Sequence, residues 1–201
     1  KGKRRYCKTI YGVSAMFIEI LYGVTFVALY HFVIKTEPSL IFSTLWIIYY
    51  TALFGVFGVM ALYDKAHTYI PVSFLLGYSF LTLIMLLLRY LEDPTMYVLL
   101  SPVIVALPFL FIWVVTRGKG LGFGDVLLFL GVGAFFGIAQ GFAVLLVSIW
   151  IGALVGLYIK YWGEGKGKKN IALPFVPFIV LAFIIVLFTG IDVYSIATLF
   201  T

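Results

Sequence analysis

The sequence predicts an all-α membrane protein, a polytopic bundle of about seven transmembrane helices with its N-terminus in the cytoplasm. Hydrophobic residues make up 64% of the 201 positions and charged residues only 11%, whereas about 25% of the residues in a soluble domain are charged. The apolar residues form repeated runs of roughly bilayer-spanning length. Such runs must be helical because lipid offers no partner to unpaired backbone groups, and they lack the alternation of a closed barrel.

The apolar runs predict seven helices in chain order. We expect them at residues 11–34, 41–62, 70–88, 96–116, 126–138, 141–159 and 173–189. The fifth and sixth are separated because residues 126–159 as one helix would be about 51 Å long, which is too long for a core of about 30 Å without strong tilt. Two short spans that turn at Gln140 and Gly141 fit better, and a re-entrant pair also fits.

The basic residues predict the orientation. With seven spans, one side of the membrane carries only Lys35 and Arg89, and the other side carries the remaining twelve of the fourteen lysines and arginines. Positive residues remain in the cytoplasm, which places the N-terminus there and the C-terminus outside. The net charge of +6 therefore reflects topology, and we expect no nucleic-acid binding.

Pairs of glycines four residues apart indicate close helix packing. Gly133 and Gly137 form one pair, and Gly152 and Gly156 form the other. Small residues at this spacing let helices approach closely, either within one chain or in a dimer, so the oligomeric state stays open.

Three of the eight acidic residues need an explanation, because a charge near the hydrocarbon is costly. The other five lie in predicted loops or in the outer tail, where water solvates them; they are Glu37, Glu92, Asp93, Glu164 and Asp192. Glu19 lies inside the first span, Asp64 ends the second and Asp125 begins the fifth. In this topology Asp64 and Asp125 lie at the same depth on the same side of the membrane.

Two carboxyl groups at one level, each at a helix end, can face one another. Like charges at short range cannot both ionise easily, and a carboxyl and a carboxylate that share one proton are the arrangement of aspartic proteases. The carboxylate takes a proton from water, the water attacks the peptide carbonyl, and the carboxyl donates to the developing oxyanion. The alternative is that Asp64 and Asp125 are boundary residues, each solvated by the cytoplasm.

A glycine-rich segment leads into Asp125. Four glycines lie within residues 118–124, and they keep side chains away from the approach to the aspartate. They also permit left-handed backbone where an extended substrate must come close. The alternative is a flexible loop in which Asp125 is an ordinary helix cap.

Several of these segments resemble the intramembrane aspartyl proteases, and in particular the bacterial type IV prepilin peptidases. Residues 122–125, Gly-Phe-Gly-Asp, match the Gly-x-Gly-Asp signature of the wider group. In residues 61–71 an Asp that ends a helix is followed seven residues later by a Pro, as in the first aspartate motif of prepilin peptidases. Their second motif resembles the set Asp125, Leu128, Gly133 and Gly137.

Both ends of the chain extend the resemblance. Residues 173–178, Leu-Pro-Phe-Val-Pro-Phe, are similar to the Pro-Phe-x-Pro-Phe element that closes the family pattern. Residues 2–7 resemble the end of the cytoplasmic cysteine region of the family, and Glu19 stands where the following helix of the family carries a glutamate. The alternative for Glu19 is a polar residue that fixes helix packing.

The resemblance implies an aspartic endopeptidase that removes the short leader of type IV pilin-like precursors at the cytoplasmic face of the bacterial inner membrane. It implies a peptidase domain at residues 11–201, embedded in membrane lipid, and a remnant of the cysteine region at residues 1–10. The implied catalytic pair is Asp64 and Asp125. The implied substrate-approach or auxiliary residues are Gly122, Gly124, Pro174 and Glu19.

The chain departs from the family pattern at several positions. Val72 stands where an aspartate usually follows the Pro of the first motif, and Leu127 stands where a lysine is usual. Arg4 occupies the place of the cysteine that would pair with Cys7, and one cysteine cannot build a tetrahedral thiolate site. We therefore expect no metal site and no cofactor for peptide hydrolysis. S-adenosylmethionine would serve only if the methyl transfer of many family members is retained, and we expect that transfer to be inefficient here.

Two alternatives remain at this point. Tyr63 with Asp64, and residues 122–125, match the presenilin and signal-peptide-peptidase type equally well, but those enzymes cut within a transmembrane helix rather than at its cytoplasmic edge. A transporter that uses both aspartates for a proton or cation would be expected to show inverted repeats and helices broken at mid-membrane. Neither sign is visible, and both aspartates lie at one edge.

Overall fold

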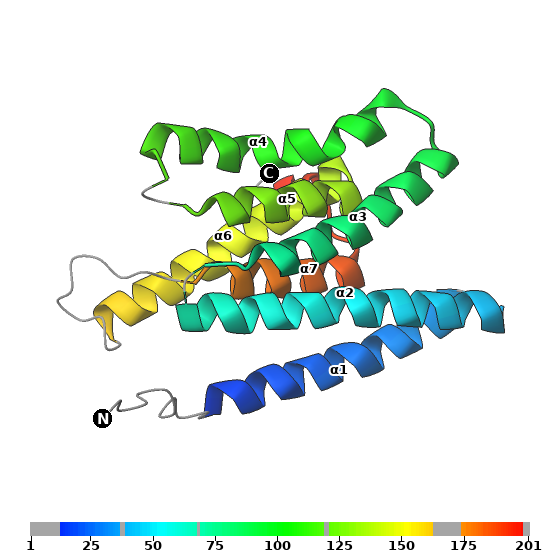
Figure 1. Ribbon diagram of the computed structural model, residues 1–201, viewed down its shortest axis with the longest axis horizontal. Coiled ribbons are helices and arrows are strands. Elements are labelled where there is room, and N and C mark those ends of the chain that lie inside the picture. The colour runs from blue at the N-terminus through cyan, green and yellow to red at the C-terminus, as the bar shows by residue number, and fades with distance from the viewer. Residues whose placement is uncertain (1–12, 37–38, 68, 119–120, 163–173, 199–201) are drawn as a thin grey trace, which may run out of the picture. The chain divides into compact units, whose positions relative to one another are not determined.

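The computed structural model describes residues 13–36, 39–67, 69–118, 121–162 and 174–198, with side chains from residue 23 onward (Figure 1). Within these ranges the regular structure is entirely α-helical, which confirms the all-α part of the predicted fold class. The chain divides into two compact units, residues 1–54 and 55–201, with the boundary inside α2. Residues 1–10, predicted to be the remnant of a cysteine region, lie outside the described residues.

The first unit contains α1 (Val13–Thr36) and the first half of α2 (Leu40–His67). This part of α2 carries an aromatic cluster one turn apart, in which the ring centroids of Trp46 and Tyr50 lie 5.7 Å from each other. Tyr49 joins the cluster with its ring 5.7 Å from that of Trp46. The unit is thus built from long apolar helices.

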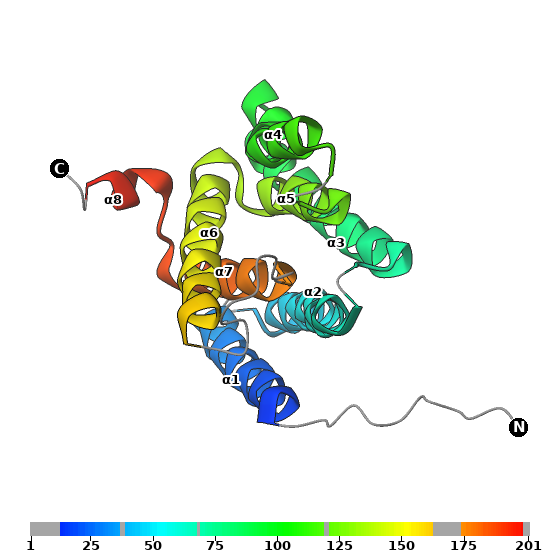
Figure 2. The same cartoon turned by 90° about the vertical axis from the view of Figure 1, so that its left-hand side faces the viewer.

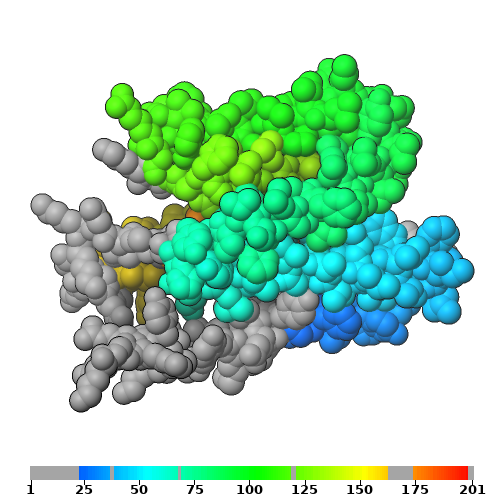
Figure 3. Space-filling model, viewed as in Figure 1, coloured from blue at the N-terminus to red at the C-terminus, as the bar shows by residue number. Residues whose placement is uncertain are grey.

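The second unit contains the end of α2 and six further helices. They are α3 (Val72–Glu92), α4 (Met96–Thr116), α5 (Phe123–Phe136), α6 (Ile138–Tyr161), α7 (Val176–Thr189) and α8 (Val193–Ala197). Figures 1 and 2 show α5 between α3 and α4, with α6 beside α7. In the space-filling view α5 is visible only as a strip between α4 and α3 (Figure 3).

Successive helices of the second unit reverse direction (Figure 1). The α2–α3 and α4–α5 connections, the end of α6 and the start of α7 therefore lie at one end of this unit, on the left of the figure. The α3–α4 and α5–α6 connections lie at the other end. The left-hand starts of α5 and α7 also lie further inside the unit than the ends of α4 and α6.

Four helices, α2, α3, α4 and α6, are long and apolar enough to cross a membrane, so the chain is a membrane protein. The described part of α1, α5 and α7 are shorter apolar helices. Both α5 and α7 have 14 residues, or about 21 Å of helix. The predicted apolar ranges all contain helices, but whether each one spans the bilayer stays a prediction.

Some boundaries differ from the predicted ones. The break between α5 and α6 is at Gly137, so the predicted turn at Gln140 and Gly141 is wrong by three residues. Gly137 has φ 81° and ψ −165°, a conformation that is essentially restricted to glycine. Gly141 is instead a packing position, because a Cβ there would lie 2.8 Å from Val105 Cγ2 of α4.

Other differences are extensions and one additional helix. Helix α2 continues to His67 and α5 begins at Phe123, so Asp64 and Asp125 lie inside helical turns rather than beside them. Helix α8 was not predicted, because five residues give no usable periodicity. Asp192 caps it, accepting a 2.7 Å hydrogen bond from the Ser195 amide. Hydrogen bonds from the amide and hydroxyl of Ser195 hold the pKa of Asp192 below its usual range.

Helices α4 and α5 approach each other closely at Gly133, as the glycine spacing predicts. A Cβ at Gly133 would lie 2.5 Å from the Ser101 carbonyl oxygen and 2.7 Å from Pro102 Cα. The Ser101 hydroxyl lies 2.7 Å from the Val98 carbonyl, which Pro102 leaves without its helical donor. The same hydroxyl lies 3.0 Å from the Gly133 carbonyl, so it serves both helices.

Candidate active site

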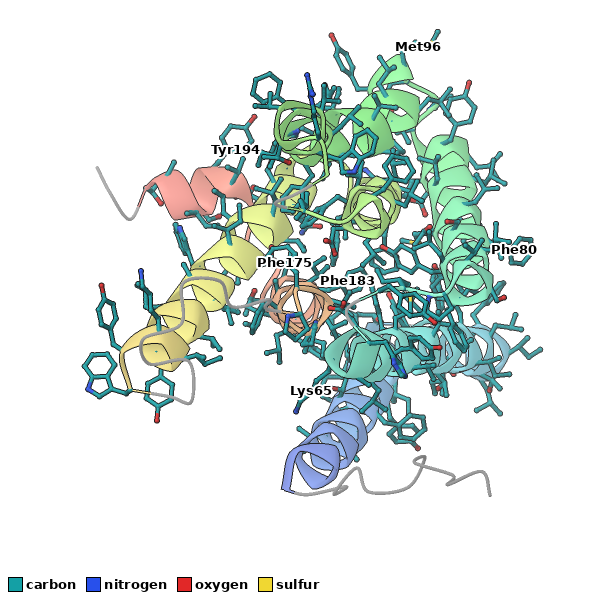
Figure 4. All side chains as sticks on the ribbon, turned by 60° about the vertical axis from the view of Figure 1, so that its left-hand side comes forward. Lys65, Phe80, Met96, Phe175, Phe183 and Tyr194 are labelled. Carbon is teal, nitrogen blue, oxygen red and sulfur yellow. The ribbon has the colours of Figure 1, made fainter. Side chains whose placement is uncertain are left out.

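Asp64 lies in the last turn of α2 and is only 7% exposed. Phe57, Met60 and Ala61 precede it at helical spacing and are also buried, so all four side chains lie on one inward face. Phe57 packs against Phe183 of α7, with ring centroids 4.9 Å apart. Figure 4 shows Phe183 in the interior of the second unit. The apolar stripe therefore directs the Asp64 carboxyl into the unit.

The start of α7 donates backbone hydrogen bonds to Asp64. The Val176 amide donates to Asp64 Oδ2 at 3.1 Å, and the Phe175 amide also bonds to this carboxyl. The first amides of a helix have no partner within it and form the positive end of its dipole. The sequence did not predict this role for Phe175 and Val176, because their side chains carry no polar group.

The prolines of this segment leave those amides available. Pro177 lies in the first turn of α7, where a missing N–H is tolerated and the fixed φ suits a helix. Pro174, predicted to be auxiliary, lies directly before the two donating residues. The Phe175 ring packs 5.6 Å from that of Phe109 in α4, which holds the start of α7 in place. Pro-Phe-x-Pro-Phe thus forms a helix start next to Asp64.

Asp125 is the third residue of α5 and is partly buried. Gly122 is the N-cap of the helix, so the alternative in which Asp125 is the cap residue is wrong. The Asp125 amide donates to the Gly122 carbonyl at 3.1 Å, and the Gly122 backbone also hydrogen-bonds to the Asp125 carboxyl. A side chain at the third position that reaches back to the N-cap backbone is half of a capping box, and it holds the Asp125 carboxyl at the helix start.

The glycines before Asp125 have different roles. Gly118 has φ 73°, and a Cβ there would lie 3.3 Å from Trp113 Nε1. Gly122 is exposed, with ordinary extended backbone at φ −72°, so left-handed backbone is not found at this predicted site residue. Gly124 makes room for the α2–α3 connection, because a Cβ there would lie 3.0 Å from Ile70 Cδ1. Gly124 therefore lets residues 69–71 cross the start of α5 closely.

The fold brings Asp64 and Asp125 together. They are 61 residues apart in sequence and belong to different helices, yet the charge of Asp64 acts on the Asp125 carboxyl. Both lie at the end of the second unit where α2 ends and α5 and α7 begin (Figure 1). A buried and a partly buried carboxyl group in electrostatic contact can hold one proton between them.

Three aromatic side chains contact one another at the end of α2 and in the α2–α3 connection, close in sequence to Asp64. The hydroxyls of Tyr63 and Tyr69 are 3.0 Å apart, and the His67 ring lies 4.6 Å from that of Tyr63. This cluster covers the α2–α3 connection. His67 packs against both tyrosine rings.

The predicted auxiliary residue Glu19 is not part of the site that the structure describes. It lies in α1, in the first unit, and its side chain is outside the described residues, as are Arg4 and Cys7. Among the side chains that the structure does describe, no group of three His, Cys, Asp or Glu residues could hold a metal ion.

Comparison with protein families identifies the chain. The family described as the type IV leader peptidase family matches residues 51–157, more than half of the chain. This range contains Asp64, Asp125 and the helices that position them, from the second half of α2 to most of α6. No curated protein and no solved structure gave a significant match. The match to the family model nevertheless covers the candidate dyad, and the chain belongs to the type IV leader peptidase family.

Proposed function

We propose that this protease is an aspartic endopeptidase whose dyad is Asp64 and Asp125. The observation that carries the proposal is the meeting of two carboxyl groups from α2 and α5 at one end of the second unit. Each accepts hydrogen bonds from backbone amides: Asp64 from the start of α7 and Asp125 from Gly122. Such a pair fits a reaction in which one proton moves between substrate, water and enzyme.

The hydrogen bonds suggest a role for each aspartate. Asp64 Oδ2 accepts from the Val176 amide, so this oxygen does not carry the shared proton. In the proposed reaction the Asp64 carboxylate takes a proton from water, and the water oxygen bonds to the peptide carbonyl carbon. The Asp125 carboxyl gives its proton to the carbonyl oxygen. The tetrahedral intermediate then breaks its C–N bond: the proton on Asp64 passes to the leaving amine, and one hydroxyl of the intermediate returns its proton to Asp125 as the carboxylic acid product forms.

The proposed substrate is a type IV pilin-like precursor, cut after the glycine that ends its basic leader and before its hydrophobic helix. Family membership supports this substrate class. The position of the dyad at helix ends supports a cut at the membrane edge rather than in its middle. Lys65, Arg117 and Lys160 are exposed at this end of the unit, which supports a cytoplasmic location by the positive-inside rule in a bacterial inner membrane. These charges would repel a basic leader, so we assign them to topology.

Hydrolysis by this dyad requires no cofactor. S-adenosylmethionine would be needed only for methyl transfer to the new N-terminus, and we propose that such transfer is inefficient because Arg4 occupies the place of the cysteine that would pair with Cys7. Incubation of the cleaved product with methyl-labelled S-adenosylmethionine measures this directly, and efficient incorporation of label would contradict it.

Substitution of the dyad tests the proposed reaction. Asp64→Asn and Asp125→Asn should each reduce precursor cleavage by at least about 10²-fold, because an amide can neither take a proton from water nor donate one as an acid. The double variant should be no slower than the single variants, since the two groups act as one unit. Leader loss is measured by the mass of the precursor after incubation with enzyme in lipid vesicles.

Asp93→Asn is the matched control, because Asp93 is exposed at the opposite end of the unit. It undergoes the same chemical change and should cleave normally. Full activity in either Asn variant of the dyad would remove that residue from the mechanism. A product cut inside the hydrophobic helix of the precursor would contradict the membrane-edge assignment and favour an activity of the presenilin type.

A further inference from the structure

Tyr78 of α3 lies between the two helices that carry the candidate dyad. Its side chain is fully buried, and its ring centroid lies 4.9 Å from that of Phe57 in α2. Its hydroxyl donates to the Leu128 carbonyl of α5 at 2.9 Å. Phe57 is two turns before Asp64 on the same face of α2, and Leu128 is about one turn after Asp125. One side chain therefore contacts both helices close to both carboxyl groups.

The ring of Tyr78 fits a slot in α5. A Cβ at Gly131 would overlap this ring, so glycine is what allows α3 and α5 to approach here. On its other side the ring packs against Phe57, which is fully buried. The rings of Tyr78 and Phe57 thus lie one against the other between α5 and α2 at this level of the unit.

Shape alone does not explain the hydroxyl, because phenylalanine would fill the same slot. Leu128 lies inside α5, where its carbonyl also belongs to the helical hydrogen-bond ladder, so the hydroxyl does not repair a broken helix. A buried hydroxyl without a partner is costly. The Tyr78 hydroxyl reaches the Leu128 carbonyl only when α5 has one particular position along its own axis. The bond therefore fixes the axial position of α5.

Two further side chains donate to carbonyls of α5. Ser101 reaches Gly133 at 3.0 Å, and Arg89 reaches Ala134 at 3.4 Å. Both acceptors lie toward the C-terminal end of α5, more than two turns from Asp125. Tyr78 makes its bond closer to Asp125 and also contacts the helix of Asp64, so it is the side chain placed to set the geometry between the two carboxyl groups.

We propose that Tyr78 is a positioning residue of the dyad: its ring sets the separation of α2 and α5, and its hydroxyl sets the height of Asp125 relative to Asp64. This inference rests on the proposed function of the two aspartates. Proton transfer requires heavy-atom distances of about 2.6–3.2 Å, and a displacement of about 1 Å can slow a reaction by about 10²-fold. A side chain that does not touch the substrate can therefore control the rate.

Tyr78→Phe tests the proposal, because it removes the hydroxyl and keeps the ring. We expect kcat for precursor cleavage to fall roughly tenfold with KM unchanged, since substrate contacts are not altered. Ser148→Ala is the matched control. Ser148 is also fully buried, but its hydroxyl donates to Leu145 within its own helix at 2.8 Å, so kcat and KM should both stay at the parent values.

A distance measurement separates this inference from the proposed function. Spin labels on cysteines at Lys65 and Phe123, which are exposed neighbours of the two aspartates, report the spacing of α2 and α5 in the Cys7→Ser background. The label–label distance should shift or broaden in Tyr78→Phe and remain as in the parent chain in Ser148→Ala. This readout does not depend on catalysis.

The outcomes are distinct. An unchanged distance and unchanged kcat in Tyr78→Phe would overturn the positioning role while leaving the dyad in place. Equal loss of kcat in Ser148→Ala, or failure of Tyr78→Phe to fold, would show a general packing role and also overturn it. If Asp64→Asn and Asp125→Asn remain active, the proposed function fails, and the spin-label distance still reports whether Tyr78 sets the helix spacing.

Discussion

Gly124 carries no side chain, yet it decides how closely the α2–α3 connection approaches the start of α5. Ile70 occupies the space that a side chain at this position would need. Because Ile70 is six residues after Asp64 and Gly124 directly precedes Asp125, their contact joins the two aspartate motifs. The glycine is therefore explained by a neighbour from another helix pair rather than by its own backbone.

Gly124→Ala should slow cleavage and yet leave the protein no less stable. The new Cβ would lie 3.0 Å from Ile70 Cδ1 and 3.6 Å from its Cβ and Cγ1, so the connection must move away from α5. We expect kcat to fall roughly tenfold, whereas alanine is about 0.5–1 kcal/mol better than glycine inside a helix. Cleavage kinetics and thermal unfolding in detergent measure the two effects.

Ile70→Val supplies the compensating change, since valine lacks the Cδ1 atom that the new methyl group would meet. The Gly124→Ala/Ile70→Val double variant should recover most of the lost kcat, and Ile70→Val alone should cleave almost normally. A double variant as slow as Gly124→Ala would show that the contact between these two residues is not the cause.

At the scale of the element, α5 is a short helix held along its length by its neighbours. Gly131 and Gly133 admit Tyr78 and the α4 backbone, and donors from α3 and α4 reach three of its carbonyls. Its C-terminal end stops at Gly137, where the Arg89 guanidinium occupies the place of a side chain. Arg89, predicted only as an outer topology charge, thus also caps α5.

Gly137→Ala should destabilise the protein more than Gly190→Ala does. Both glycines have positive φ, 81° and 67°. A Cβ at Gly190 would meet nothing within 4 Å, whereas a Cβ at Gly137 would overlap the Arg89 guanidinium. We expect a loss of about 1 kcal/mol at Gly190 for a left-handed alanine, and at least about 2–3 kcal/mol at Gly137 for its glycine-restricted backbone and the overlap.

Thermal or denaturant unfolding of both variants in detergent measures these losses. Equal losses would indicate that Arg89 moves away at no cost and does not fix the break between α5 and α6.

Whether a feature could be predicted from the sequence depends on how far apart in the chain the interacting residues lie. Apolar length predicts the helices because each run satisfies its own backbone, and the spacing of Gly133 predicts a close approach. Other contacts involve segments that are distant in sequence. They are the α4 backbone at Gly133, Arg89 at the break at Gly137, and the amides of Phe175 and Val176 at Asp64. Apolar side chains gave no signal for those amides, since the groups that bond belong to the backbone.

At the scale of the whole molecule, one end of the second unit is basic and aromatic. Lys65, Arg117 and Lys160 are exposed there. The last turn of α6 adds Tyr161 and Trp162, exposed by 56% and 76%, with Lys160 Nζ 5.8 Å from the Tyr161 ring centroid. Aromatic and basic residues together are typical of a cytoplasmic membrane interface. The dyad lies at this same end.

Cysteine labelling tests this orientation. In a Cys7→Ser background, single cysteines at Lys65, Arg117 and Lys160 should react with a membrane-impermeant reagent only when the cytoplasmic face is open. A cysteine at Asp93 should react from outside. Labelling of the Lys160 position from outside would contradict the reversal of direction between α5 and α6, whereas uniform inversion of all four positions would contradict only the orientation.

The shortness of α5 and α7 has a consequence for the supply of water. At about 21 Å each, the two helices are about 9 Å shorter than a hydrocarbon core of about 30 Å, and a short segment thins the bilayer around it. Both helices begin at the dyad, recessed from the ends of α4 and α6 (Figure 1). We expect this local mismatch to bring the aqueous phase down to the carboxyl groups, so that hydrolysis draws its second reactant through the deformed bilayer rather than through a channel in the protein.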